Sequence, residues 1–381
     1  MTVASSGSST RVIAFLPSLG LGGGIERYNQ WLLHSLEVGG IEVVRVPLRI
    51  GGERPTLWRK VRFIGRCFRA LSRSKHKPSV VVLVAHPSLG IACSLASRLA
   101  RIHPLRSWLL YYGQDSWSLS RWERRILVLT KLAPITISSF SAGTLAGTHN
   151  APVLVPGLHS EWYAELARSQ RSEPSGSETA LKLITVFRLP EAEAKGLPTI
   201  IEAVTRLRQE GHMCTLTVAG SGSLEPWLQN RVNDLPWLSL IASPSDEKLA
   251  SLYAGADLFV LATRTSHTGH LSGEGFGIVL VEAQLAGTPV VAPAFGGSSS
   301  AFLDRLTGLS PADESAESLV RVLSMLIADR PMLHKLGVNA QRWAAVEFEP
   351  TRRAQEACEI ILGSQVAPSP LPLELVEETR N

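Results

Sequence analysis

Two carboxylates eight residues apart are the clearest chemical feature of the sequence. Glu274 lies in the glycine-rich segment GEGFG, and Glu282 lies in the apolar segment IVLVEAQLAG that follows it. Gly275 and Gly277 allow the backbone to approach a ligand closely, and the first N–H groups of a helix that starts here are suited to bind an anion. A carboxylate accepts hydrogen bonds from neighbouring hydroxyls, which sugars and ribose offer. Because a charge in an apolar helix rarely persists without a partner, Glu282 is expected to bind a ligand.

Two cations in the same half of the sequence could complement these carboxylates. Arg188 follows the apolar run LITVF, and Lys195 lies seven residues later, in a loop that leads to a predicted helix. Cations at the carboxyl end of a parallel strand are suited to bind a diphosphate. One Arg and one Lys in a loop are often merely solvated, so this interpretation depends on their occurrence together with Glu274 and Glu282.

Short apolar runs alternate with helical patterns along most of the chain. This alternation predicts parallel strands joined by helices, and 381 residues are too many for one hydrophobic core. We therefore predict an α/β protein with two facing Rossmann-like domains and a cleft between them. Strands are expected at residues 11–17, 42–46, 80–85, 108–112, 134–137 and 153–155 in the first domain, and at 183–187, 216–219, 238–242, 258–262 and 289–292 in the second.

The domain boundaries follow from changes in composition. The N-terminal domain is expected over residues 11–168 and the C-terminal domain over residues 181–345, with the polar stretch 169–180 as the linker. The Ser-, Thr- and Gly-rich residues 1–10 and the Pro-rich, acidic residues 366–381 are expected to be disordered. A last helix is expected over residues 346–365.

Composition and charge exclude several classes of protein. With 45% apolar and 19% charged residues, and four widely spaced cysteines, the chain is neither a disordered protein nor a disulfide scaffold. Neither a membrane span nor a signal peptide is apparent, so a cytoplasmic protein is predicted. Residues 1–165 carry 20 Lys and Arg against 8 Asp and Glu, a net +12, whereas residues 166–381 carry −7. The basic half suggests an anionic partner.

A basic amphipathic helix is predicted over residues 56–74. It allows two interpretations that do not exclude each other. The helix could pack its apolar stripe on the sheet and leave its cations in solvent, or it could contact an anionic membrane at the inner face of the cytoplasmic membrane. The expected apolar stripe consists of Leu57, Val61, Ile64, Phe68 and Leu71, and the cations are Arg59, Lys60, Arg62, Arg66, Arg69 and Arg73.

Further short segments accompany these residues in a fixed order. Together they resemble the retaining glycosyltransferases of the GT-B fold, specifically family 4, the glycosyl transferases group 1. The resemblance covers most of the chain, which makes it far more specific than any one motif. The matching segments are GGGIERY at 22–28, SSFS at 138–141, VPG at 155–157, FRL at 187–189 with KG at 195–196, AGSG at 219–222, Glu274 through Glu282, GG at 296–297 and TGL at 307–309.

The resemblance implies both a fold and an activity. The fold is GT-B, with the helix at 346–365 returning to the N-terminal domain. The activity is that of a hexosyltransferase, which moves a hexosyl unit from a UDP- or GDP-sugar to a glycan or lipid-linked acceptor with retention, in cell-surface polysaccharide or glycolipid biosynthesis. The nucleotide sugar is a co-substrate, and no other cofactor and no divalent metal are expected, because cations of the chain take the metal's place.

The resemblance also implies roles for single residues. Glu274 would hold hydroxyls of the donor sugar, and Glu282 would hold the ribose. Arg188 and Lys195 would bind the diphosphate and stabilise the charge on the leaving group. The diphosphate site would be completed by the backbone at Phe276 and Gly277 and by the loop of Gly22, Gly23 and Gly24. The base would lie near Ala242, Ser243 and Pro244. The candidate catalytic residues are Glu274 and, in the N-terminal domain, Asp115 and His86.

The sequence also departs from the family pattern at two informative positions. Phe187 stands where a Gly usually precedes the Arg, and Tyr112 stands where a His is common. The Tyr112 departure leaves open a non-catalytic scaffold that keeps only the fold. A sugar-nucleotide epimerase and a glycosyltransferase of small secondary metabolites also remain alternatives.

Two other classes fit the sequence poorly. A dinucleotide-dependent oxidoreductase is disfavoured because Ile25 stands where the third glycine of its phosphate loop belongs, and because the strand at 42–46 is not followed by an acidic residue for the ribose. Nucleic-acid binding is not expected, since the basic residues lack interleaved stacking aromatics.

Overall fold

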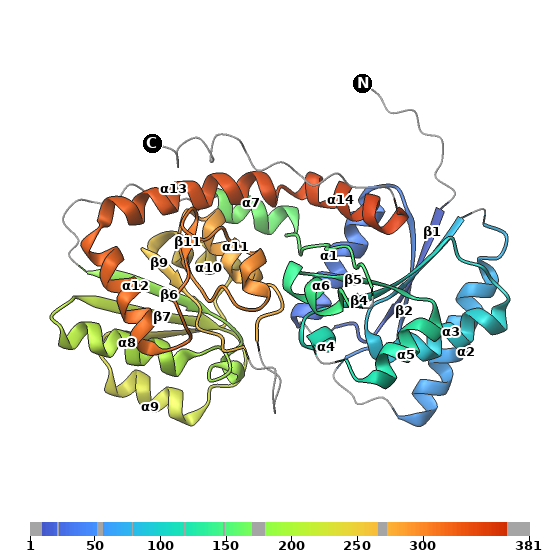
Figure 1. Cartoon of the computed structure of the whole chain (residues 1–381), viewed down its shortest axis with the longest axis horizontal. Helices are drawn as coiled ribbons and strands as arrows, with labels where there is room; N and C mark the ends of the chain where they lie inside the picture. The colour runs from blue at the N-terminus through green and yellow to red at the C-terminus, as the bar shows by residue number, and fades with distance from the viewer. Residues whose placement is uncertain are drawn as a thin grey trace, which may run out of the picture. The chain divides into compact units, whose positions relative to one another are not determined.

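A computed structural model of the chain describes residues 10–20, 23–51, 56–77, 79–117, 119–147, 149–169, 180–265 and 273–363. The chain divides into two compact units, coloured mainly blue to green and green to orange in Figure 1. The first unit contains the described residues up to Gly157 together with the segment from Pro350, and the second unit runs from Leu158 to Glu349. The sequence analysis placed the end of this domain at residue 168, whereas the first unit ends earlier, at Gly157. The linker expected at 169–180 and the two termini expected to be disordered lie almost entirely outside the described residues.

The first unit is built on a five-stranded parallel sheet with the strand order β2-β1-β3-β4-β5. Strand β1 pairs with β2 on one side and β3 on the other, and Val12 lies between Val43 and Val81 in register. Strands β1 and β3 are rich in β-branched residues and buried on both faces, as is usual for parallel sheets covered by helices. The strands of the sheet are β1 (Thr10–Leu16), β2 (Glu42–Pro47), β3 (Ser79–Val84), β4 (Arg106–Tyr111) and β5 (Ala133–Thr136).

The helices of the first unit come from both ends of the chain. The last helix packs against the first helix, and it is tied to the sheet because Trp108 Nε1 donates a 2.8 Å hydrogen bond to the Ile361 carbonyl. The helices are α1 (Gly24–Val38), α2 (Leu57–Arg73), α3 (Gly90–Ala100), α4 (Gln114–Trp117), α5 (Arg121–Thr130), α6 (Ser139–Leu145) and α14 (Pro350–Leu362), with a 3₁₀ turn η1 at Pro87–Leu89.

Helix α2 buries a different stripe from the one expected. Its buried residues are Phe63, Cys67 and Leu71, which follow one another at intervals of four residues. Phe63 meets Phe15 of β1 edge to face, with ring centroids 6.3 Å apart. The stripe expected from the sequence is therefore wrong except at Leu71: Leu57, Val61 and Phe68 are exposed, and Ile64 is half-buried. Helix α2 consequently has apolar side chains on two faces.

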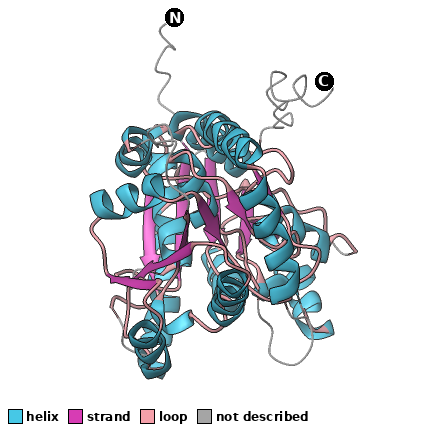
Figure 2. Cartoon of the chain, turned by 90° about the vertical axis from the view of Figure 1, so that its left-hand side faces the viewer, coloured by secondary structure: helices cyan, strands magenta, loops and turns pink. Residues whose placement is uncertain are grey.

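The second unit is built on a six-stranded parallel sheet with the order β11-β10-β9-β6-β7-β8. Figure 2 shows strands side by side with helices around them. Register is set by long pairings such as that of β6 with β7, in which Ile184 lies opposite Thr217. The strands are β6 (Leu181–Val186), β7 (Cys214–Gly220), β8 (Leu238–Ala242), β9 (Leu258–Val260), β10 (Val290–Val291) and β11 (Gly308–Leu309).

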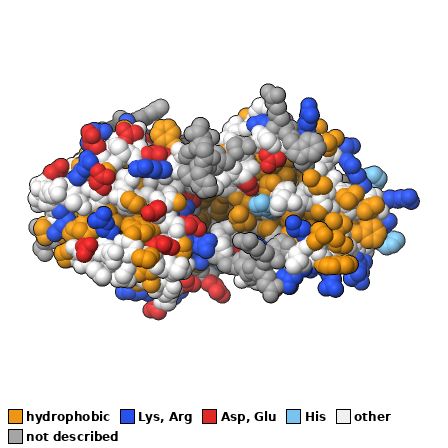
Figure 3. Space-filling view, turned by 90° about the horizontal axis from the view of Figure 1, so that it is seen from below, with side chains coloured by type: hydrophobic (Ala, Val, Ile, Leu, Met, Phe, Trp, Pro, Cys, Tyr) orange, Lys and Arg blue, Asp and Glu red, His pale blue; other side chains and the backbone are white. Residues whose placement is uncertain are grey.

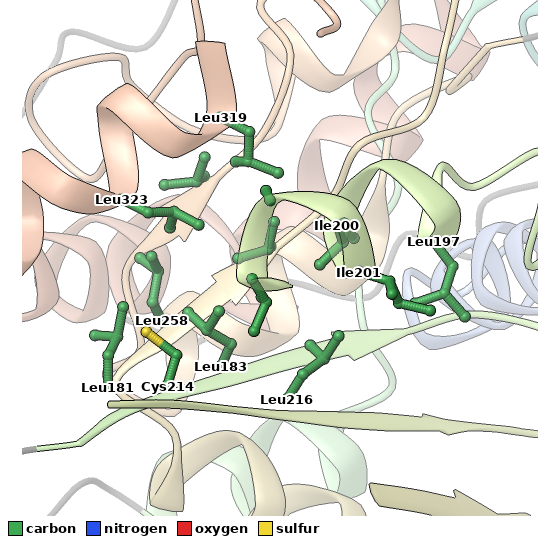
Figure 4. Close-up of a cluster of buried hydrophobic side chains, with 14 of the residues drawn as sticks. Leu181, Leu183, Leu197, Ile200, Ile201, Cys214, Leu216, Leu258, Leu319 and Leu323 are labelled. Carbon is green, nitrogen blue, oxygen red and sulfur yellow. The ribbon is translucent and has the colours of Figure 1, made fainter. Parts of the chain in front are cut away.

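A leucine-rich core joins this sheet to its helices. Leu197 and Ile200 of α8, with Leu319 and Leu323 of α12, pack over buried residues of the strands such as Leu183 (Figure 4). The helices are α7 (Ser160–Arg168), α8 (Leu197–Gln209), α9 (Pro226–Asp234), α10 (Asp246–Gly255), α11 (Ile278–Leu285), α12 (Ala316–Ala328) and α13 (Arg330–Glu347), with 3₁₀ turns η2 (Leu189–Glu191) and η3 (Gly297–Ser300). Within the part of the chain that the structure describes, no helix is both long and apolar enough to span a bilayer.

Candidate functional site

The loop that carries Glu274 is fixed by backbone packing between two glycine-containing segments. The Gly297 N–H donates a 2.8 Å hydrogen bond to the Glu274 carbonyl. A Cβ on Gly297 would lie 1.9 Å from the Gly275 carbonyl oxygen, so no larger residue fits there. Gly277 adopts φ 88° immediately before α11, a left-handed conformation that favours glycine. These glycines hold the Glu274 backbone in one place at the start of α11.

Lys195 and Glu274 form a direct ion pair. Lys195 Nζ lies 2.8 Å from Glu274 Oε2, and only 20% and 16% of the two side chains are exposed. The neighbouring Gly196 has φ 76°, and a Cβ there would lie 1.9 Å from the Ala262 carbonyl oxygen. Close packing at Gly196 thus seats the lysine loop against the segment after β9. Burial lowers the pKa of Lys195, but Glu274, helped by Glu191, outweighs it and raises that pKa above its usual value. Lys195 is therefore a cation at neutral pH.

Arg188 lies at the surface beside this ion pair in sequence but does not share its burial. Its guanidinium is 3.3 Å from Glu191 Oε1, and its side chain is 60% exposed. An exposed ion pair of this kind contributes little to stability and can readily exchange partners. The structure thus brings Lys195 and Glu274 together and leaves Arg188 exposed at the end of β6.

Glu282 is a buried carboxylate held by two neutral donors. Tyr253 Oη donates a 2.8 Å hydrogen bond to Oε2, and Trp162 Nε1 donates a 2.9 Å hydrogen bond to Oε1. Sequence reasoning named neither donor, because Trp162 lies on α7 and Tyr253 on α10, far from Glu282 along the chain. The expectation that a charge in this apolar helix needs partners is met by protein groups. Since each carboxylate oxygen accepts more than one hydrogen bond, ligand hydroxyls can add to these two.

The loops after β6, β7 and β8 meet at the carboxyl edge of the second sheet. A Cβ on Gly220 would lie 1.7 Å from the Phe187 carbonyl oxygen, and the Ser243 N–H donates a 2.7 Å hydrogen bond to the Gly220 carbonyl. Ser243 has φ 47°, so the backbone turns sharply there. Ala242 and Ser243 are exposed and Pro244 is half-buried. Phe187 is buried in the core, so the residue that replaces the usual Gly stabilises the sheet.

Asp115 caps a short turn in the first unit. Its Oδ1 accepts hydrogen bonds of 2.8 Å from the Tyr112 N–H and 2.9 Å from the Gly113 N–H. Burial raises the pKa of Asp115 to about 6, although these backbone donors act in the opposite direction. Tyr112 itself is buried, and its hydroxyl bonds Asn29 Oδ1 at 2.6 Å and the Ala85 carbonyl at 3.0 Å. The tyrosine that stands where the family commonly has a His is therefore buried and hydrogen-bonded to other residues of the first unit.

His86 follows β3 and caps the 3₁₀ turn η1. Its Nδ1 accepts a 3.2 Å hydrogen bond from the Ser88 N–H. Nδ1 also lies 2.8 Å from Ser88 Oγ, a contact in which either atom can be the donor. Burial lowers the pKa of His86, which favours the neutral ring. A neutral ring that accepts the Ser88 N–H at Nδ1 carries its proton on Nε2, where it can donate a hydrogen bond.

The remaining predicted site residues belong to the loop before α1 and the start of α11. Gly23 immediately precedes α1 and Gly24 begins it; nothing lies within 4 Å of a Cβ placed on either, so open space surrounds them. Gly22 lies outside the described residues. Phe276 is buried, with its ring centroid 6.2 Å from that of Phe348. Among the residues that the structure describes, no group of three or more His, Cys, Asp or Glu side chains could hold a metal ion.

Comparison with known proteins relates this geometry to a family. Residues 168–343, which carry Arg188, Lys195, Glu274 and Glu282, match the model of the family described as glycosyl transferases group 1. Over these residues, which make up less than half of the chain, the sequence is similar to the group 1 glycosyltransferases.

One similar relative is the GDP-mannose-dependent alpha-(1-6)-phosphatidylinositol monomannoside mannosyltransferase of Mycolicibacterium smegmatis. It is 27% identical over 361 residues, which cover 90% of this chain and 89% of the relative. Two solved structures are similar in fold. The structure of HepE of Anabaena in complex with UDP-glucose matches with a TM-score of 0.66 and 18% sequence identity. The match covers 92% of this chain and 99% of HepE. WaaG, a glycosyltransferase involved in lipopolysaccharide biosynthesis, has a TM-score of 0.62 at 17% identity, with 92% and 100% covered. The two parallel-sheet, Rossmann-like units therefore form a GT-B fold.

Proposed function

We propose that this chain is a glycosyltransferase that moves a hexosyl unit from a UDP- or GDP-sugar to a lipid-linked or glycan acceptor, with retention of the anomeric configuration, in cell-surface glycolipid or polysaccharide biosynthesis. The observation that carries the proposal is the ion pair between Lys195 and Glu274 at 2.8 Å. It holds a cation suited to a diphosphate beside a carboxylate suited to sugar hydroxyls, on two adjoining loops of one unit. A nucleotide sugar presents these two groups next to each other.

Donor binding would exchange the partners of this ion pair. The diphosphate takes Lys195, and the sugar hydroxyls take the carboxylate of Glu274, so neither charge loses its partner. Arg188 leaves its exposed pair with Glu191 and adds a second cation to the diphosphate. As the bond to the sugar breaks, negative charge develops on the leaving phosphate, where these cations stabilise it. In this scheme Arg188 and Lys195 neutralise the charge that a divalent metal would otherwise neutralise. Turnover should therefore be unchanged when EDTA is added.

Glu282 would bind the ribose of the donor. Trp162 and Tyr253 each donate to one carboxylate oxygen and so fix the orientation of both. The ribose hydroxyls then meet acceptors that are already in position, which reduces the entropic cost of binding. The backbone at Ala242, Ser243 and Pro244 is the proposed contact for the base.

Proton transfer needs no strong base of the protein in this scheme. The leaving phosphate oxygen can accept the proton of the acceptor hydroxyl as the new bond forms, which gives retention by transfer on one face of the sugar. Asp115 and His86 are the proposed residues of the first unit for acceptor binding. With its proton on Nε2, His86 would donate a hydrogen bond to an acceptor oxygen.

The class of acceptor is supported by the relatives and by charge. The names of the relatives above refer to a phosphatidylinositol mannoside and to lipopolysaccharide biosynthesis. Residues 1–165 carry a net charge of +12, which favours an anionic acceptor such as a phosphorylated lipid glycan.

A panel of UDP-, GDP- and ADP-sugars tests the donor. A selective donor should raise the melting temperature by mass action, and the same donor should be consumed only when a lipid-linked acceptor is added. NMR of the product should show the anomeric configuration of the donor. An inverted product would refute retention, and an epimerised nucleotide sugar formed without acceptor would favour an epimerase.

A further inference from the structure

We propose that helices α2, α3 and α5 of the first unit form a surface that docks this enzyme on an anionic lipid bilayer. The inference rests on the proposed function, because it identifies where the enzyme would meet a lipid-linked acceptor. We call this set of side chains the docking surface; its apolar members are Leu57, Trp58, Val61, Phe68, Ile91, Leu95, Leu99, Val128 and Leu129.

The apolar side chains of α2 stay exposed although the helix is packed. Phe63, Cys67 and Leu71 already attach α2 to the sheet, so its outer apolar residues are not needed for folding. Leu57 and Trp58 in the first turn are 78% and 76% exposed. A large aromatic side chain left in water at the start of a cationic helix is typical of helices that bind the membrane interface.

Helix α3 continues this surface with a regular apolar stripe. Ile91, Leu95 and Leu99 recur at intervals of four residues, and all three are exposed. Helix α3 packs against α2 on one side and against α5 on the other, and α5 exposes Val128 and Leu129. Figure 1 shows the three helices next to one another.

The exposed apolar residues are concentrated rather than scattered. Nine of the seventeen large hydrophobic side chains that are exposed among the described residues lie on these three helices. Figure 3 shows hydrophobic side chains gathered beside Lys and Arg side chains on the first unit. Single exposed apolar residues need no explanation, but a group of this size marks an interaction surface.

The charge of α2 and α3 has a single sign, and α5 adds Arg121, Arg124 and Arg125 against one acidic residue, Glu123. From residue 54 to residue 114 the sequence has twelve Lys and Arg and not one Asp or Glu. On α2 the exposed cations are Arg59, Lys60, Arg62, Arg69 and Arg73. A partner for this surface must therefore offer both negative charge and an apolar interior.

An anionic bilayer satisfies both requirements. Lipid headgroups pair with the cations, while the apolar side chains enter the boundary of the acyl chains. A second copy of the chain would place like charges opposite one another, which disfavours a symmetric dimer through this surface. A nucleic acid would match the charge but would leave the apolar residues without partners.

Co-sedimentation of the full chain with vesicles tests the proposal. Vesicles of phosphatidylcholine with phosphatidylglycerol should bind the protein at low salt, and binding should fall as salt rises. Vesicles of phosphatidylcholine alone should bind much less. Failure to bind the anionic vesicles at low salt would overturn the proposal.

Two double variants separate the contributions of the surface. Leu95→Glu with Leu99→Glu places acidic groups in the apolar stripe, and Arg62→Glu with Arg69→Glu reverses two cations. Because each surface cation contributes on the order of five-fold in membrane affinity, the second variant should weaken binding by at least ~25-fold. Met213→Glu and Arg342→Glu, at exposed positions of the second unit, are matched controls that should bind as the unchanged protein does.

The same variants distinguish failure of docking from failure of the proposed function. Both double variants should keep the melting-temperature increase given by the nucleotide sugar, because the donor residues lie in the second unit. Equal vesicle binding by the double variants and the controls would refute the docking surface and leave the donor site intact. A concentration-dependent dimer that the double variants abolish would show instead that a second copy covers the surface.

Discussion

Lys195 Nζ lies 2.8 Å from Glu274 Oε2, so the proposed diphosphate cation and the proposed sugar carboxylate are bonded to each other in the structure. Glu274 raises the pKa of Lys195 and so keeps the lysine charged, and the ion pair holds both side chains in position within a largely buried site. The pair needs no reorganisation of the backbone to accept a donor, because glycines at 196, 277 and 297 already fix both loops. Five predictions follow from this arrangement and its surroundings.

Lys195→Ala should reduce kcat/KM by on the order of 100-fold. The variant removes the buried cation that would stabilise the leaving diphosphate, and it leaves Glu274 without its ion-pair partner. Steady-state kinetics with the selected nucleotide sugar measure the loss. Lys195→Arg keeps the positive charge on a side chain of different shape, so it should recover part of the activity. If Lys195→Ala shows the same kinetics as the wild type, Lys195 does not belong to the site.

Glu274→Ala should lower turnover strongly while the bare nucleotide still binds. Its carboxylate is proposed to contact the sugar, so the nucleoside diphosphate loses nothing and gains a lysine freed from its ion pair. Thermal shift with UDP or GDP, compared with the complete nucleotide sugar, checks the difference. If affinity for the bare nucleotide falls as far as affinity for the sugar nucleotide, Glu274 has been assigned to the wrong part of the donor.

Arg188→Ala should raise the donor KM and leave the free energy of unfolding within about 1 kcal/mol of wild type. Its pair with Glu191 is exposed, so it adds little to folding. Arg206→Ala is the matched control, because Arg206 is also exposed and paired with a glutamate, Glu202, but lies on α8. The control should change neither KM nor stability. Equal KM values in the two variants would contradict the role of Arg188.

Tyr253→Phe should raise the donor KM by on the order of tenfold, because a hydrogen bond to the buried carboxyl group of Glu282 is lost and that side chain can rotate. Tyr163→Phe also removes a tyrosine hydrogen bond in the same unit, from the Ala345 carbonyl, without touching Glu282. Both variants should lose a similar amount of stability, but only the first should change KM. A parallel change in both would mean that Tyr253 serves the fold alone.

Asp115 should make the free energy of unfolding depend on pH. Its pKa of about 6 in the folded chain lies above its value in the unfolded chain, about 4, so the folded state binds the proton more tightly. Stability from this group is therefore complete below pH 4 and is lost as pH rises to about 6, by roughly 3 kcal/mol. Asp115→Asn keeps an oxygen for the backbone donors and should flatten this part of the profile in urea unfolding. An unchanged slope between pH 4 and 6 would contradict the assignment.

The order of strands and helices could be predicted from the sequence because strands in a parallel sheet are continuous apolar runs. The strand expected at 153–155 is the exception: only an isolated bridge joins Val153 to Thr136. The short strand at Gly308–Leu309 was not expected, since two residues carry no periodic signal.

The stripe on α2 was misjudged for a different reason. Both of its faces carry apolar residues, and periodicity alone does not tell which face meets the sheet. The contact of Phe63 with Phe15 decides this, and it depends on how the helix packs.

At the candidate site, the sequence predicted which residues carry the chemistry, but it did not predict their ion-pair and hydrogen-bond partners. Lys195 and Glu274 were named from motifs, and their contact arises only when loops 79 residues apart meet. Trp162 was missed because it lies 120 residues from Glu282 and belongs to a helix that the sequence placed in the other domain. Local spacing in the sequence indicates that a carboxylate needs hydrogen-bond partners. Which residues become those partners is decided only when distant segments pack together.

Helix α14 gives the first unit a discontinuous chain, with consequences during synthesis. The Ile361 carbonyl that bonds Trp108 is translated only after residues 158–349 of the second unit, so the nascent first unit must wait on the ribosome with the Trp108 side chain and a face of α1 uncovered. Its maturation is then coupled to synthesis of α14, and a chain that stops before this helix would present the uncovered face to chaperones and proteases.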